Sequence, residues 1–134
     1  MEYDLVHAFF GRFGILIPLL AVFFELAGIL TQKKVVSMLA GFLVLVSSII
    51  VVTAGITGYL QYLYLKTQYT DISIYKIHMI LGSVTTVMFL VIGMIRIFLF
   101  IKIVEKLVVF YMLFYVTAIL INLISNEIIL HRLY

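Results

Sequence analysis

Long apolar segments separated by short polar ones dominate the chain. Nearly uninterrupted apolar residues occupy about 5–30, 35–65, 73–100 and 107–130. Each run has the roughly 20 residues that a helix needs to cross a hydrocarbon core about 30 Å thick. Backbone groups in lipid must be hydrogen-bonded internally, and these runs are too long to be barrel strands. The pattern therefore predicts four membrane-spanning helices.

The connections between the apolar runs are short. TQKK (31–34) and KIVEK (102–106) predict tight turns, and KTQYTDISIYK (66–76) predicts one longer loop. Short connections make successive helices antiparallel neighbours. We therefore expect a single domain over 1–134, an all-α integral membrane four-helix bundle with up-down topology. Five tyrosines near one predicted membrane surface are typical of an aromatic belt: Tyr59, Tyr62, Tyr64, Tyr69 and Tyr75.

Composition agrees with a membrane location and narrows the chemistry. Of the 134 residues, 66% are apolar and 11% charged, whereas soluble domains carry about a quarter charged residues. The net charge of +3 is spread along the chain and argues against a nucleic-acid partner. Cysteine is absent, which excludes disulfides, iron–sulfur clusters and covalently attached c-type haem. No basic region precedes the first run, so we expect it to be retained as a span.

Two of the apolar runs share one layout. HAFFGRFGILIPLLAVFFE (7–25) and HMILGSVTTVMFLVIGMIR (78–96) each begin with a histidine, followed four residues later by Gly11 or Gly82. Each ends in an ionisable residue 18 positions from its histidine. Eighteen residues make about five helical turns, so both ends share a helix face. The offset of 71 residues between the runs indicates an old duplication of a helix pair, which the second and fourth runs support poorly.

The three histidines, His7, His78 and His131, are candidate metal ligands on one side of the membrane. The first and third helices would be diagonal in the bundle, and imidazoles reaching inward from diagonal helices can hold a haem b. Gly11 and Gly82 would leave room for the macrocycle. Basic residues near the same face are candidate propionate partners: Arg12, Lys76 and Arg132. Hydration at the membrane interface explains these histidines equally well, and His131 is expected to be an indirect or alternative ligand at most.

Three acidic or basic groups lie within or beside the spans. Glu25 and Arg96 fall at matching depths, and because charges inside spans are usually paired or functional, we predict an ion pair. A structural salt bridge explains the pair better than a proton path. Glu127 near the histidine face is a candidate proton acceptor for a quinol, although a hydrated helix-end position explains it better.

Small residues and one proline make further predictions about packing. Gly41, Ser48 and Gly55 recur every seven residues in the second run, and small residues in membranes let helix backbones approach closely. We expect this face to contact another helix. Pro18 lies inside the first run and should kink that helix or remove one backbone hydrogen bond.

Four short motifs carry a resemblance to a known family. The chain resembles the small four-span membrane proteins known as domain of unknown function twenty-two thirty-one in VHAFF, TAGITG, IHMILG and SNEIILHR, one motif in each run. The family's usual His-Pro or Phe-Pro near the start is missing, and Ser125 and Asn126 stand where it has paired glycines. The resemblance implies a four-helix membrane fold and a link to membrane redox proteins.

Together these features predict a b-type cytochrome-like subunit that passes electrons between a quinone pool and a partner redox subunit. The alternative is a cofactor-free membrane anchor or assembly subunit of a larger complex. A small transporter is less favoured because the chain shows no pair of broken helices. Basic residues divide five to four between the two sides. By the positive-inside rule, this division favours both termini outside. We expect the membrane to be a prokaryotic cytoplasmic membrane.

Overall fold

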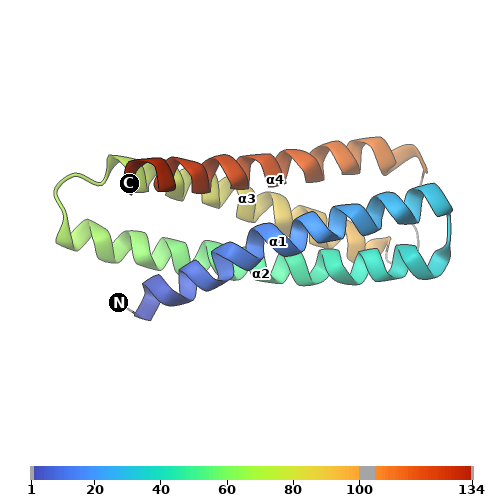
Figure 1. The fold of residues 1–134 in the computed structure, drawn as a ribbon, viewed down its shortest axis with the longest axis horizontal. Helices are drawn as coiled ribbons and strands as arrows, with labels where there is room; N and C mark the ends of the chain where they lie inside the picture. The colour runs from blue at the N-terminus through green and yellow to red at the C-terminus, as the bar shows by residue number, and fades with distance from the viewer. Residues whose placement is uncertain (1, 100–104, 134) are drawn as a thin grey trace.

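Four long helices make up the protein in the computed structural model, which describes the backbone of residues 2–99 and 105–133 (Figure 1). The helices are α1 (Glu2–Thr31), α2 (Lys34–Gln68), α3 (Ser73–Phe98) and α4 (Glu105–Leu133). Side chains are described for 4–99 and 106–131. All four helices are long and apolar enough to cross a membrane. The protein is therefore an integral membrane protein, as the apolar runs predict.

Successive helices are antiparallel neighbours. α1 packs along α2, α2 along α3 and α3 along α4, whereas α1 and α4 close the bundle with far less contact. α1 and α3 are therefore diagonal and run in the same direction, as do α2 and α4. The predicted up-down four-helix bundle is confirmed.

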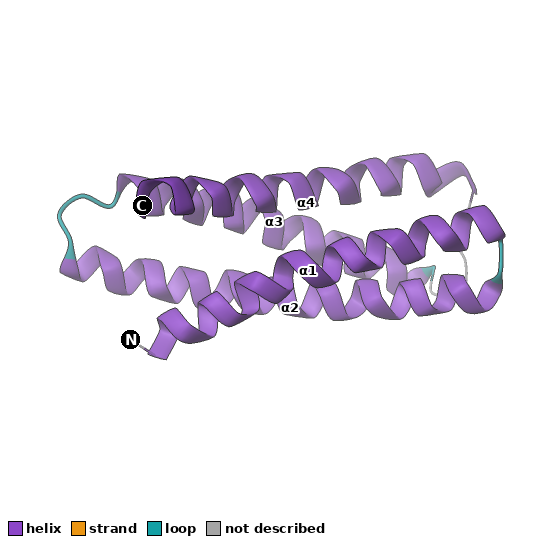
Figure 2. Cartoon of the chain, viewed as in Figure 1, coloured by secondary structure: helices purple, strands orange, loops and turns teal. Residues whose placement is uncertain are grey.

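The connections are shorter than predicted. Only Gln32 and Lys33 separate α1 from α2, and only residues 69–72 separate α2 from α3. Figure 2 draws both connections as teal loops. The prediction of a loop over 66–76 was wrong in extent, because both flanking helices continue into it. α2 has 35 residues and is about 52 Å long at 1.5 Å per residue. Its polar end therefore continues as helix beyond the hydrocarbon core.

The start of α3 is fixed by a hydrogen bond within its short loop. The Ser73 backbone N–H donates to the Asp71 carboxylate at 3.1 Å. Hydrogen bonds from Ser73 hold the pKa of the Asp71 carboxyl below its ordinary value. The turn predicted over 102–106, and the end of the third run at 100, fall largely outside the described residues.

The two helix pairs repeat each other in many of their buried positions. Equivalent residues of the two pairs are 71 positions apart in the sequence, the distance from His7 to His78. Buried positions recur with the same spacing: Gly14 with Thr85, Glu25 with Arg96, Ala40 with Tyr111, Val44 with Tyr115, Ser47 with Ala118, and Ser48 with Ile119. The second and fourth helices therefore belong to the repeat, although their residue types conceal it. A pseudo-two-fold axis along the bundle relates the halves.

Differences in side-chain size make the two halves unequal. α2 has Ala40 and Val44 in the core where α4 has Tyr111 and Tyr115. Small residues let α2 approach α3 closely, whereas the bulkier tyrosines on α4 keep it farther from α1. The bundle is therefore tight between α2 and α3 and more open between α1 and α4.

Close contacts between α2 and α3 confirm the packing predicted from small residues. A side chain built at Gly55 would overlap the Thr86 hydroxyl. One built at Gly93 on α3 would meet the Ser48 hydroxyl at 3.0 Å. Gly41 is also buried. The face with seven-residue spacing therefore contacts a helix and not lipid.

Two side chains of α4 bond to the backbone of α1 around Pro18. Proline has no N–H, so the Gly14 carbonyl loses its usual intrahelical donor. The Asn122 amide donates to that carbonyl at 3.0 Å, and the Tyr115 hydroxyl donates to the Pro18 carbonyl at 3.0 Å. Unpaired backbone groups are costly in lipid, so Asn122 supplies the hydrogen bond that Pro18 cannot.

This pairing predicts that the effect of changing Asn122 depends on Pro18. Asn122→Ala should lower the free energy of unfolding by about 1 kcal/mol, the scale of a hydrogen bond between membrane helices. In a Pro18→Ala background the new N–H can bond the Gly14 carbonyl, so the same change should cost less. Unfolding of the four proteins in detergent micelles tests this. An equal cost in both backgrounds would show that the two residues are not coupled.

Candidate functional site

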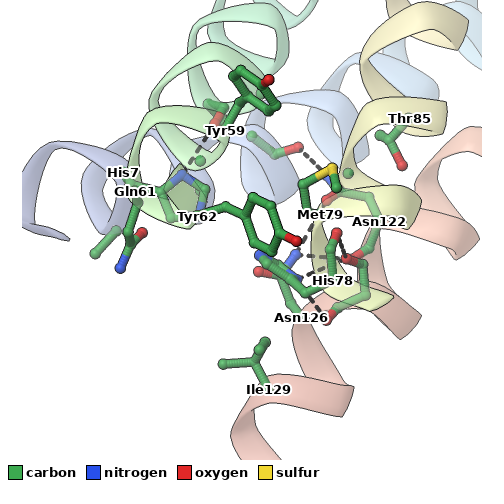
Figure 3. Close-up of a pocket in the computed structure, with 18 of the residues that line it drawn as sticks. His7, Tyr59, Gln61, Tyr62, His78, Met79, Thr85, Asn122, Asn126 and Ile129 are labelled. Carbon is green, nitrogen blue, oxygen red and sulfur yellow. Dashed lines mark hydrogen bonds between the residues drawn. The ribbon is translucent and has the colours of Figure 1, made fainter. Parts of the chain in front are cut away.

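A pocket opens inside the bundle at the end where α1 and α3 begin (Figure 3). Its volume is about 610 Å³, within the range of about 300–1,000 Å³ that is typical of ligand sites. All four helices contribute to it. Its central side chains belong to His7 and His78, and Tyr62 from α2 also turns toward it. Four of the five tyrosines predicted for an aromatic belt line it: Tyr59, Tyr62, Tyr69 and Tyr75.

His7 and His78 face each other in this pocket. Their ring centres are 5.9 Å apart, with the ring planes inclined by 74°. They come from diagonal helices and occupy equivalent positions of the two repeats. The pair therefore lies at the pseudo-two-fold axis, where the shared layout of the two runs predicted that the histidines would converge.

Each histidine ring is hydrogen-bonded to the backbone of the next helix. His7 Nδ1 is 3.0 Å from the Ala54 carbonyl oxygen, and His78 Nδ1 is 2.9 Å from the Ser125 carbonyl oxygen. A carbonyl only accepts hydrogen bonds, so each Nδ1 carries a proton and donates it. In a neutral ring the lone pair is then on Nε2. Both carbonyls lie 47 residues beyond their histidine, so the two repeats build the same contact.

A hydroxyl group lies near the Nδ1 atom of each histidine ring, at different distances in the two repeats. Ser125 Oγ lies 2.8 Å from His78 Nδ1 and donates to the His78 carbonyl at 3.3 Å. Thr57 Oγ1 lies 3.4 Å from His7 Nδ1 and donates to the Thr53 carbonyl at 2.9 Å. Ser125 is therefore the closer of the two hydroxyls to its ring.

Glycines shape the pocket in two different ways. A side chain added at Gly11 or Gly82 would meet nothing within 4 Å, so open space lies one helical turn from each histidine. A side chain at Gly58 would come within 2.7 Å of His7 Cε1. Gly58 is needed for the His7 ring to lie against α2. The pattern of small residues predicted helix packing and did not identify this contact with a side chain.

The basic residues predicted near the site are distributed differently. Arg12 lines the pocket. Lys76 is exposed and is not among the lining residues described. The Arg132 side chain lies outside the described residues. Of the three predicted propionate partners, the structure therefore brings Arg12 to the pocket.

The third histidine lies at the surface. His131 Nε2 is 2.9 Å from Glu127 Oε1, one turn earlier on α4, and its side chain is 80% exposed. Within the described part of the chain, no three His, Cys, Asp or Glu side chains gather to hold a metal ion. His131 therefore does not join His7 and His78, and Glu127 pairs with His131 instead of lining the pocket.

Polar side chains of α4 line the pocket where the sequence suggested only a polar helix end. Asn122, Ser125 and Asn126 all face it. The Asn126 amide donates to the Asn122 carbonyl at 2.8 Å. The sequence indicated this lining only by the presence of polar residues. The direction in which their side chains point depends on how α4 is rotated about its axis.

The predicted ion pair is present at the other end of the bundle. Arg96 Nη2 lies 3.0 Å from Glu25 Oε1, and both side chains are buried. Arg96 also donates to the carbonyls of Leu99 at 2.6 Å and Ser37 at 2.5 Å. Eighteen residues of helix place this pair about 27 Å from the histidines. It therefore stabilises the bundle away from the pocket.

Comparison of the chain with protein-family models, curated proteins and solved structures finds no match. The family resemblance carried by the four short motifs gains no support from these comparisons. The chain is a small membrane protein with four spans, and the function of its pocket must be argued from geometry.

The buried ion pair makes a prediction of its own. Arg96→Met leaves the Glu25 carboxylate buried without its partner and should cost about 3–5 kcal/mol of stability. Glu25→Met combined with Arg96→Met should cost less than the sum, because no unpaired charge remains. Unfolding of the two single variants and the double variant in detergent measures the coupling. Additive losses would show that the contact carries no interaction energy.

Proposed function

We propose that the protein is a b-type cytochrome of the membrane, in which His7 and His78 ligate one haem b. One observation carries the proposal. Both rings face one pocket, and each donates its Nδ1 proton to a backbone carbonyl, which leaves Nε2 free to bind a metal. Metal-ligating histidines in proteins almost always donate their other ring N–H in this way.

The dimensions of the site support this ligand set. Imidazole–metal bonds are about 2 Å long, so two nitrogens on opposite sides of one ion are about 4 Å apart. Rings with centres 5.9 Å apart are within reach of one shared ion. The open space beside Gly11 and Gly82 suits a flat macrocycle. Arg12 at the pocket supplies a positive charge that can pair with a propionate.

Bound at this site, haem b would supply one-electron chemistry. The residues of the chain would hold the haem and fix the orientation of its ligands. His7 and His78 would both hold the iron, which would favour electron transfer over reaction of a substrate there. Ala54 and Ser125 would fix the ring orientations through their carbonyls.

The electron partners would be other molecules. The described helices leave only short connections outside the bilayer, so the donor and acceptor would be a quinone pool and a membrane or peripheral redox subunit. The exposed Glu127–His131 pair at the same end of the bundle would be a candidate proton acceptor for a quinol. We propose that the protein lies in a prokaryotic cytoplasmic membrane with both termini outside.

The absorption spectrum tests the proposal. Protein produced with an ample supply of haem should give a b-type reduced-minus-oxidised spectrum of six-coordinate iron. His7→Ala and His78→Ala should each lose the six-coordinate form, whereas His131→Ala should retain it, because His131 lies at the surface. A parent protein without haem would overturn the proposal and favour a cofactor-free membrane anchor.

Gly82→Ala tests where the macrocycle lies. Without haem, this variant should be as stable as the parent or gain up to about 1 kcal/mol, because alanine is the better helix former. Its haem affinity should nevertheless fall, since the new methyl group enters the open space. Gly55→Ala is the matched control: its methyl group would meet Thr86 and should destabilise even the haem-free protein. Unfolding and haem titration give both quantities, and unchanged haem affinity in Gly82→Ala would contradict this placement.

A further inference from the structure

We propose that the two histidines hold the haem unequally: His78 is the permanent anchor, and His7 is the ligand that a small external molecule replaces. The external molecule would be a small iron ligand such as carbon monoxide or imidazole. This inference rests on the proposed function and adds a second property to the same site. Differences between the two repeats in hydrogen bonding and in helix packing support it.

The His78 ring is held by a closed set of hydrogen bonds. Its Nδ1 proton is shared between the Ser125 carbonyl at 2.9 Å and the Ser125 hydroxyl oxygen at 2.8 Å. The hydroxyl donates in turn to the His78 carbonyl at 3.3 Å. Ser125 is 1% exposed, so water does not compete for these bonds. The His78 ring therefore has its proton and its orientation fixed from one residue of α4.

The equivalent contacts of His7 are weaker. The Ala54 carbonyl accepts its Nδ1 proton at 3.0 Å, but alanine supplies no hydroxyl. The Thr57 hydroxyl oxygen is 3.4 Å away, beyond the usual 2.7–3.2 Å of an N–H···O bond. That hydroxyl is already bonded to the carbonyls of Thr53 and Ala54. Its contribution to holding His7 is therefore small.

The helices that carry the two histidines are also held differently. α3 packs closely against both α2 and α4, whereas α1 packs closely against α2 and meets α4 much less. The bonds described between α4 and α1 reach the Gly14 and Pro18 carbonyls, two to three turns beyond His7. The His7 ring lies close against α2 at Gly58. The described hydrogen bonds near His7 therefore come from α2, including the one from Gln61 to Asp4, whereas α4 holds the His78 ring.

The two hydroxyls provide a test that leaves both ligands in place. In the haem-loaded protein, Ser125→Ala should speed the transfer of haem to an excess of a haem-free globin by about tenfold, the scale expected when a partner of a metal-ligating histidine is removed. Thr57→Val should leave the transfer rate nearly unchanged. Equal acceleration by both changes, or faster transfer from Thr57→Val, would overturn the inference.

Carbon monoxide identifies which histidine stays bound. In the reduced parent protein it should displace His7, so the infrared C–O stretch reports the bond from iron to His78. Ser125→Ala should shift that stretch, Thr57→Val should not, and His7→Ala should give the parent's frequency. A shift with Thr57→Val alone, or a parent that does not bind carbon monoxide, would overturn the inference while leaving the cytochrome proposal intact. A parent that takes up no haem would overturn both.

Discussion

Polar groups inside a bilayer have no water to bond, and this constraint accounts for the contacts that hold the bundle together. The Gly14 carbonyl that Pro18 leaves without a donor is bonded by Asn122. The Arg96 guanidinium meets a carboxylate and two carbonyls. The His7 and His78 rings bond to carbonyls of the next helix. Each of these bonds fixes the position of one helix along another. The contacts that stabilise the fold therefore also align the residues that line the pocket.

The internal repeat explains why the site lies on the axis. Two hairpins with the same buried positions pack around a pseudo-two-fold axis, so equivalent residues meet there in pairs: His7 with His78 at one end and Glu25 with Arg96 at the other. The two halves are nevertheless unequal. Tyrosines on α4 replace small residues on α2, which opens the seam between α1 and α4, and Ser125 replaces the alanine that bonds His7. The site keeps the symmetry of its ligands but not of their surroundings.

Length and periodicity make the spans and their order predictable from the sequence, whereas contacts that depend on helix rotation are much less so. Four spans and the up-down order derive from apolar runs and short connections, and the matched 18-residue spacing predicts that Glu25 meets Arg96. The bond from Asn122 to Gly14 depends on how α4 faces α1, which a nearly uniform apolar helix does not reveal. The contact between Gly58 and His7 is hidden for the same reason. His131 turns to Glu127 because a partner one helical turn away is nearer than the pocket.

The central claim is that the histidines of the two repeats ligate one haem together. Near-infrared magnetic circular dichroism of the oxidised protein tests this most directly, because the energy of its charge-transfer band identifies the pair of axial ligands. We expect one haem per chain, low-spin iron, and the band of bis-histidine ligation. High-spin iron, or a band from any other ligand pair, would contradict the claim.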